Sequence, residues 1–124
     1  MKHGIFFIVI IIIIFASCNF FSVTLKNDKI TADEAYDYLL KHHDDINLVL
    51  LDVRTKEEYD NIHLKNSILI DFYQTSFADE IKKLDKSKTY LVYCRTDRRS
   101  SGTLELMKEL GFKDVHVILG GMVE

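Results

Sequence analysis

The sequence predicts an α/β fold in which a small, mainly parallel sheet is flanked by helices. Short apolar runs of strand type alternate with runs whose apolar residues recur at helical spacing. The run at 47–53 is nearly continuously apolar, which is typical of a parallel strand covered on both faces. Cys94 follows a second apolar run of strand type, at 89–93, and ligands of such sheets bind beyond the C-terminal ends of strands.

The elements after residue 28 follow from local signals. Thr31 and Glu34 form a capping box, as do Thr55 and Glu58, and each box starts a predicted helix. Gly111 suits the left-handed residue that ends a helix, and Phe112 can then contact Met107. The predicted helices are 32–42, 55–60, 77–84 and 100–110, and the predicted strands are 47–53, 67–70, 89–93 and 115–118.

Residues 1–17 are predicted to be a signal peptide. A basic start precedes an apolar run at 5–15, which is too short to span a bilayer. Ala16 and Ser17 stand directly before Cys18, and this arrangement resembles the lipobox of bacterial lipoproteins. The resemblance implies cleavage before Cys18 and a lipid on that residue.

The expected organisation is therefore a signal at 1–17, a lipidated Cys18 with a tether at 18–28, and a domain at 29–124. An uncleaved anchor that continues through Val23 and a plain cleaved signal are the alternatives. All three place the domain outside the cytoplasm, on the periplasmic side of a membrane.

Composition limits the remaining function classes. The chain has 124 residues, enough for one domain, and its net charge of −3 gives no basic field for nucleic acid. Its two cysteines could form one disulfide in an exported protein, but lipidation of Cys18 would prevent that. We expect neither a cofactor nor a metal site, since the adjacent residues of His42-His43-Asp44-Asp45 do not face one another on a helix.

Cys94 lies in a setting that favours a charged sulfur. The loop Cys94-Arg95-Thr96-Asp97-Arg98-Arg99-Ser100 joins a strand to a helix and contains three arginines. Helix N-termini and neighbouring arginines both stabilise a thiolate. Successive backbone N–H groups in such a turn also form a cradle for anions. A buried, inert core cysteine is the alternative interpretation.

From about residue 29 to residue 122 the chain resembles a rhodanese-like sulfurtransferase domain. Three segments carry the resemblance, in the family's order. They are Leu51-Asp52-Val53-Arg54 with Glu58-Tyr59 and His63; Val92-Tyr93-Cys94-Arg95-Thr96 with Arg99-Ser100; and Leu110-Gly111-Phe112 with Val115 and Leu119-Gly120-Gly121-Met122.

The resemblance implies a rhodanese-like fold and a persulfide mechanism. Cys94 would take a sulfane sulfur from a small anionic donor such as thiosulfate and pass it to cyanide or a thiol. Arg95, Thr96, Asp97, Arg98, Arg99 and Ser100 would form the active-site loop, with Arg99 partly structural and Arg95 and Arg98 facing the substrate. Asp52, Arg54 and His63 would support the site, and an ion pair between Arg54 and Glu58 is possible at their spacing. The sequence identifies no protein partner.

Asp97 departs from the family's usual Gly. If the turn needs a positive φ, Asp tolerates it better than most residues do. Its charge beside the thiolate would oppose ionisation and repel thiosulfate, so the residue points to another donor.

Three other functions share these features. Phosphatases of the cell-cycle type and some arsenate reductases resemble rhodaneses, but their loop is C-x5-R, whereas Cys94 to Arg99 is C-x4-R. A membrane-tethered binding module without turnover is the second alternative. The third is a persulfide carrier that needs a second protein.

Replacing Cys18 tests the lipoprotein prediction. Metabolic labelling with a fatty acid should label the wild-type chain and the Cys94→Ala control, whereas Cys18→Ala should lose the label because its thiol is gone. Label retained by Cys18→Ala would contradict lipidation at this residue.

Overall fold

The computed structural model describes residues 25–122, and they form a five-stranded sheet with helices on both faces. The strand order is β1-β5-β4-β2-β3, and each pair of neighbouring strands is parallel. This confirms the predicted α/β class. The strands are β1 (Lys29–Ile30), β2 (Leu48–Asp52), β3 (Ile68–Leu69), β4 (Thr89–Tyr93) and β5 (Asp114–Ile118); the helices are α1 (Ala32–Lys41), α2 (Lys56–Asn61), α3 (Phe77–Lys82) and α4 (Arg98–Glu109).

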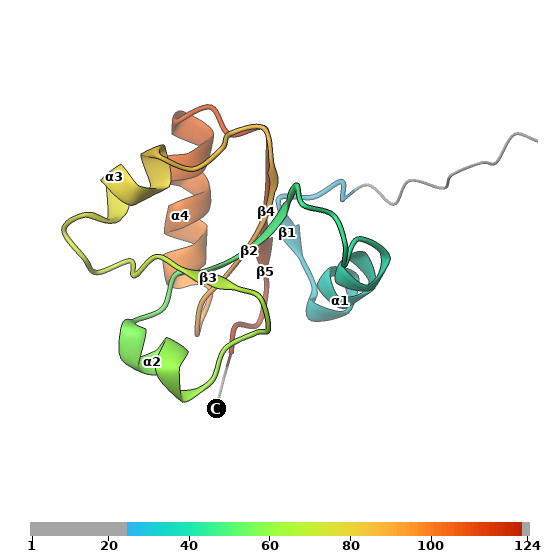
Figure 1. Cartoon of the computed structure of the whole chain (residues 1–124), viewed down its shortest axis with the longest axis horizontal. Helices are drawn as coiled ribbons and strands as arrows, with labels where there is room; N and C mark the ends of the chain where they lie inside the picture. Colours follow the sequence, from blue (N-terminus) through green and yellow to red (C-terminus); the bar gives the residue numbers. More distant parts are fainter. Residues whose placement is uncertain (1–24, 123–124) are drawn as a thin grey trace, which may run out of the picture.

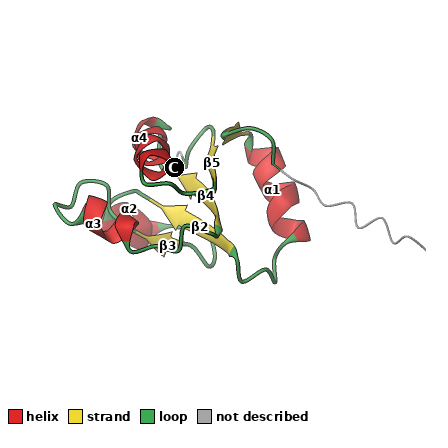
Figure 2. Cartoon of the chain, turned by 90° about the horizontal axis from the view of Figure 1, so that it is seen from above, coloured by secondary structure: helices red, strands yellow, loops and turns green. Residues whose placement is uncertain are grey.

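The helices divide unequally between the two faces of the sheet. Helix α1 lies alone on one face, and α2, α3 and α4 lie on the other (Figure 1, Figure 2). Each face has its own apolar cluster. Strand β4 contributes to both, because its side chains alternate: Tyr90, Val92 and Cys94 belong to the cluster under α3 and α4, and Leu91 and Tyr93 to the cluster under α1. The alternation of the strand therefore determines on which face the cysteine lies.

The predicted helix ends are confirmed in detail. Both capping boxes are present, at Thr31 with Glu34 and at Thr55 with Glu58. At the end of α4, Gly111 has φ +85°; its N–H donates to the Lys108 carbonyl, and that of Phe112 donates to the Met107 carbonyl, each at 3.0 Å. This is the Schellman arrangement expected for the sequence.

Helix α4 begins at Arg98, two residues earlier than predicted. Asp97 before it is in the left-handed region, with φ +69°, so the chain turns sharply and becomes helical at once. The positive φ considered for this residue is thus confirmed. Arg98 and Arg99 consequently belong to the first turn of the helix and not to a loop.

Strand β1 was not predicted. It has only two residues, and it pairs with Val117 and Ile118 of β5. The residues before it also contact the domain: the Asp28 carboxylate lies 2.6 Å from Lys108 Nζ, and the Asn27 carbonyl lies 2.6 Å from His116 Nδ1. These partners are about 80 to 90 residues away in the chain, so no local pattern announces the strand.

Residues 25–122 contain neither a helix that could span a membrane nor a cluster of metal ligands. Among them no helix is both long and apolar enough to cross a membrane. In the same range no three His, Cys, Asp or Glu side chains are grouped closely enough to hold a metal ion. The segments 1–17 and 18–24, which carry the predicted signal and Cys18, lie outside the described residues.

Candidate active site

Cys94 directly follows the C-terminal end of β4, and residues 95–97 separate it from the start of α4. The residue has no exposed surface. Its Sγ lies 3.3 Å from the Ser100 hydroxyl and accepts a hydrogen bond from the Ser100 N–H at 3.4 Å. The first turn of a twelve-residue helix therefore points at the sulfur, and the partial positive charge of that end favours a negative sulfur.

The loop also offers unused hydrogen-bond donors. Within residues 25–122, no acceptor is found for the backbone N–H groups of residues 95 to 99. Such groups are expected where a helix starts, because its first turn has no intrahelical acceptors. Backbone N–H groups without an acceptor, in a turn that leads into a helix, can bind an anion.

The three arginines that follow Cys94, one in the loop and two in the first turn of α4, differ in their surroundings. Arg99 is buried and forms a two-fold hydrogen bond with Glu58, at 2.7 and 2.8 Å, while its guanidinium lies 5.5 Å from the Tyr73 ring centre. Arg95 and Arg98 are exposed, and neither forms an ion pair with any residue of the 25–122 range. The two exposed arginines are thus available to an anion outside the loop, and Arg99 holds the helix in place.

Glu58 connects the loop to helix α2. Hydrogen bonding to Arg99 lowers the pKa of Glu58 from 4.5 to about 2, against the opposing effect of burial, and the Thr55 backbone and side chain lower it further. The same hydrogen bond to Glu58 raises the pKa of Arg99, to which the nearby Cys94 sulfur adds. A capping residue of one helix therefore anchors the first turn of another helix 41 residues later.

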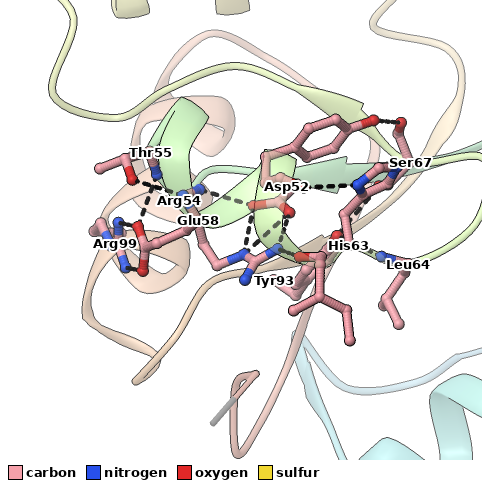
Figure 3. Close-up of polar contacts among 11 residues, drawn as sticks. Asp52, Arg54, Thr55, Glu58, His63, Leu64, Ser67, Tyr93 and Arg99 are labelled. Atoms are coloured by element: carbon pink, nitrogen blue, oxygen red, sulfur yellow. Dashed lines mark hydrogen bonds and ion pairs between the residues drawn. The ribbon is translucent and has the colours of Figure 1, made fainter. Parts of the chain in front are cut away.

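Asp52 and Arg54 form a second, fully buried ion pair. Arg54 donates to both carboxylate oxygens of Asp52, at 2.8 to 3.1 Å, and to the Ile62 carbonyl at 2.5 Å (Figure 3). Arg54 therefore does not pair with Glu58, as its spacing had allowed, because Arg99 binds Glu58 instead. The pair connects the end of β2 to the segment after α2.

His63 lies at the edge of this network. It is exposed, its ring stacks on Tyr59 at 3.8 Å between centres, and its Nδ1 lies 2.7 Å from the Tyr59 carbonyl. Tyr93 contributes to the same region, where its hydroxyl accepts from the Leu64 N–H and donates to Ser67 (Figure 3). Burial, followed by the Asp52 carboxylate, raises the pKa of Tyr93 to about 12, so this hydroxyl serves as a neutral hydrogen-bonding group.

The segment Gly120-Gly121-Met122 crosses the cysteine loop, and we name it the strap. The Met122 N–H donates to the Cys94 carbonyl at 2.8 Å, and the Gly120 N–H donates to Asp97 Oδ2 at 3.2 Å. A Cβ on Gly121 would stand 1.8 Å from the Arg95 carbonyl oxygen. At Gly121 the strap therefore lies against the loop with no room for a side chain.

Most of the predicted site residues lie near Cys94 in the structure, and Glu58 and the strap join them. Thr96 and Arg95 are exposed on the loop, and Arg95 shares a cleft of about 430 Å³ with α2 residues. Sequence reasoning missed the roles of Glu58 and of the strap. Glu58 already had a role as the N3 residue of a capping box, and no local pattern assigns it a distant arginine; the paired glycines before Met122 were the available signal for the strap.

The Glu58–Arg99 pair makes a pH-dependent contribution to stability. Because the pKa of Glu58 is lowered on folding, the contribution is complete above pH 4.5 and is lost as the pH falls towards about 2. Glu58→Gln keeps the cap but removes the charge, so it should cost about 2 to 3 kcal/mol at neutral pH. Denaturant unfolding between pH 2 and pH 7 measures both effects. The exposed Glu57→Gln is the control, and equal pH profiles for the two variants would contradict the assignment.

The close approach of the strap can be tested at two neighbouring glycines. Gly120 and Gly121 both have positive φ, +92° and +59°, so alanine at either costs about 1 to 2 kcal/mol. Only at Gly121 would the new methyl meet backbone, so Gly121→Ala should cost at least about 1 kcal/mol more and should expose Cys94 to alkylation. Denaturation midpoints and thiol-labelling rates measure this, and equal losses in the two variants would refute it.

Comparison with known proteins identifies the family. The model of the rhodanese-like domain family matches residues 35–124. The thiosulfate sulfurtransferase GlpE of Coxiella burnetii is 33% identical over 88 residues, which cover 71% of this chain and 77% of GlpE. The probable adenylyltransferase/sulfurtransferase MoeZ of Mycobacterium tuberculosis is 33% identical over 98 residues, which cover 79% of this chain but only 24% of MoeZ.

Solved structures agree with the observed architecture. A rhodanese-like domain protein from Staphylococcus aureus matches with a TM-score of 0.65 and 28% identity, over 77% of this chain and 88% of that one. A rhodanese-related protein from Thermoplasma volcanium matches with a TM-score of 0.62 and 29% identity, over 76% of this chain and 86% of that one. The fold, the loop and the match to the family model lead to one conclusion. The chain belongs to the rhodanese-like domain family.

Proposed function

We propose that the chain is a sulfurtransferase that carries a sulfane sulfur as a persulfide on Cys94. The observation that carries the proposal is the position of the Cys94 sulfur, which accepts the Ser100 N–H within a loop of free backbone donors. The names of relatives such as GlpE support the reaction class. A small sulfane-sulfur donor, of which thiosulfate is the simplest example, and cyanide or a thiol as acceptor are parts of the same proposal.

The chemical step needs only a thiolate. The Cys94 sulfur attacks the outer sulfur of thiosulfate, a sulfur–sulfur bond forms, and the bond to the sulfonate sulfur breaks with release of sulfite. The terminal persulfide sulfur then carries the negative charge, and the free N–H groups of the loop stabilise it in the way an oxyanion hole stabilises oxygen. A thiophilic acceptor attacks that terminal sulfur, and the Cys94 thiolate is restored.

The surrounding charges support this sequence of events. The exposed Arg95 and Arg98 attract an anionic donor from solution. Arg99 adds positive charge beside the sulfur but stays bound to Glu58, so it holds the loop and does not follow the ligand. Because Cys94 has no exposed surface, the donor reaches it only when the loop or the strap moves.

That burial also favours a second candidate, a binding module without turnover. In this role Cys94 would remain a core residue, and the loop would contact only a partner. The proposed membrane attachment through Cys18, with the domain on the extracytoplasmic side, is compatible with either role. Persulfide formation separates the two candidates.

The decisive measurement is the mass of the protein after treatment with a sulfur donor. Full-length protein in mild detergent, incubated with thiosulfate or with a polysulfide, should gain one sulfur atom on Cys94 and lose it again to cyanide. Cys94→Ser is the control and should gain nothing.

Two outcomes would contradict the proposal. If neither donor adds sulfur to Cys94, the binding module becomes the better interpretation. If the protein instead hydrolyses a small aryl phosphate and Cys94→Ser abolishes the hydrolysis, the loop belongs to a phosphatase.

A further inference from the structure

Asp97 stands between the cysteine and the strap. Its carbonyl accepts hydrogen bonds from the Ser100 hydroxyl at 3.1 Å and from the Ser101 N–H at 2.9 Å. The Ser100 hydroxyl in turn lies 3.3 Å from Cys94 Sγ. The Ser100 hydroxyl thus links the backbone of Asp97 to the Cys94 sulfur.

The carboxylate of Asp97 is poorly compensated. The side chain is half-buried: its Oδ2 accepts only the Gly120 N–H, at 3.2 Å and at an exposed position, and its Oδ1 is buried with no hydrogen-bond partner within residues 25–122. No cation of that range lies within ion-pair distance, although Arg95 and Arg98 belong to the same loop. A buried acceptor without a donor is costly and is therefore unusual in a folded protein.

An uncompensated carboxylate at this point acts on the charge of an incoming donor. Coulomb repulsion scales with the product of the charges and grows where water is excluded. Thiosulfate carries two negative charges, whereas the persulfide of an uncharged thiol carries one or none. Asp97 therefore penalises the first donor at least twice as strongly as the second.

We infer that Asp97 is a specificity-determining residue that directs the loop towards organic persulfides of low charge and away from dianionic sulfur donors. The inference rests on the proposed function, because it requires sulfur transfer to Cys94. In the favoured step the Cys94 thiolate attacks the outer sulfur of R–S–SH. A new sulfur–sulfur bond forms, the bond between the two donor sulfurs breaks, and R–S⁻ leaves while Cys94 becomes Cys94–S–SH.

Two substitutions separate the charge of Asp97 from its contact. Asn tolerates the left-handed backbone, and its side-chain oxygen can still accept the Gly120 N–H, so Asp97→Asn removes the charge alone. Asp97→Gly removes both the charge and the contact. Glu105→Gln is the matched control, because it removes one negative charge from an exposed position further along α4.

The experiment compares two donors on the full-length protein in detergent. Persulfide formation on Cys94 is followed by mass spectrometry, with thiosulfate and with the persulfide of N-acetylcysteamine. Asp97→Asn should raise the second-order rate with thiosulfate by about tenfold or more and change the rate with the organic persulfide by less than about threefold. Asp97→Gly should shift the preference in the same direction, and Glu105→Gln should leave it unchanged.

The outcomes distinguish this inference from the proposed function. Equal changes with both donors, or none, in Asp97→Asn would overturn the role of Asp97 and leave the sulfurtransferase proposal intact. A shift of donor preference in Glu105→Gln as large as that in Asp97→Asn would also overturn it, because general charge would then explain the effect. No persulfide from either donor in any variant would overturn both.

Discussion

The Glu58–Arg99 ion pair is the interaction on which the geometry of the cysteine loop depends. It joins the first turn of α2 to the first turn of α4, and its two side chains are only 21% and 10% exposed. A pair this well shielded gives little net stability over apolar packing, but losing one partner leaves a charge without compensation. Its main contribution is therefore to geometry: the capping box orients Glu58, Glu58 orients Arg99, and Arg99 positions the helix end that faces the sulfur.

The buried Asp52–Arg54 pair fixes the segment after α2 to the end of β2, just as Glu58–Arg99 fixes the start of α4 to α2. It follows β2, which is hydrogen-bonded to β4 along its whole length, and it reaches the Ile62 carbonyl. The two pairs hold charged groups around an otherwise apolar strand end. The side chains of β4 alternate between the two apolar clusters, and β4 is paired with β2 on one side and β5 on the other. This pairing fixes Cys94 on the face covered by α4.

What the sequence predicted well was local, and what it missed was distant. The capping boxes, the Schellman end and the apolar strands each depend on neighbours within a few residues. Strand β1 depends on its pairing with β5, and the role of Glu58 depends on an arginine in another helix, so neither has a local signature. The early start of α4 comes from the left-handed Asp97, whose conformation a residue type permits but does not require.

The loop combines charges of opposite sign at different depths. Arg95 and Arg98 are exposed, and their field reaches roughly one Debye length, about 8 to 10 Å, into the solvent. One oxygen of the half-buried Asp97 carboxylate is shielded from water, so its field on a nearby charge is less screened than that of the exposed arginines. Attraction by the exposed arginines and repulsion by the shielded carboxylate thus favour different properties of a ligand. The outer arginines raise the encounter rate of any anion, whereas the inner carboxylate penalises each negative charge that must come close to the sulfur.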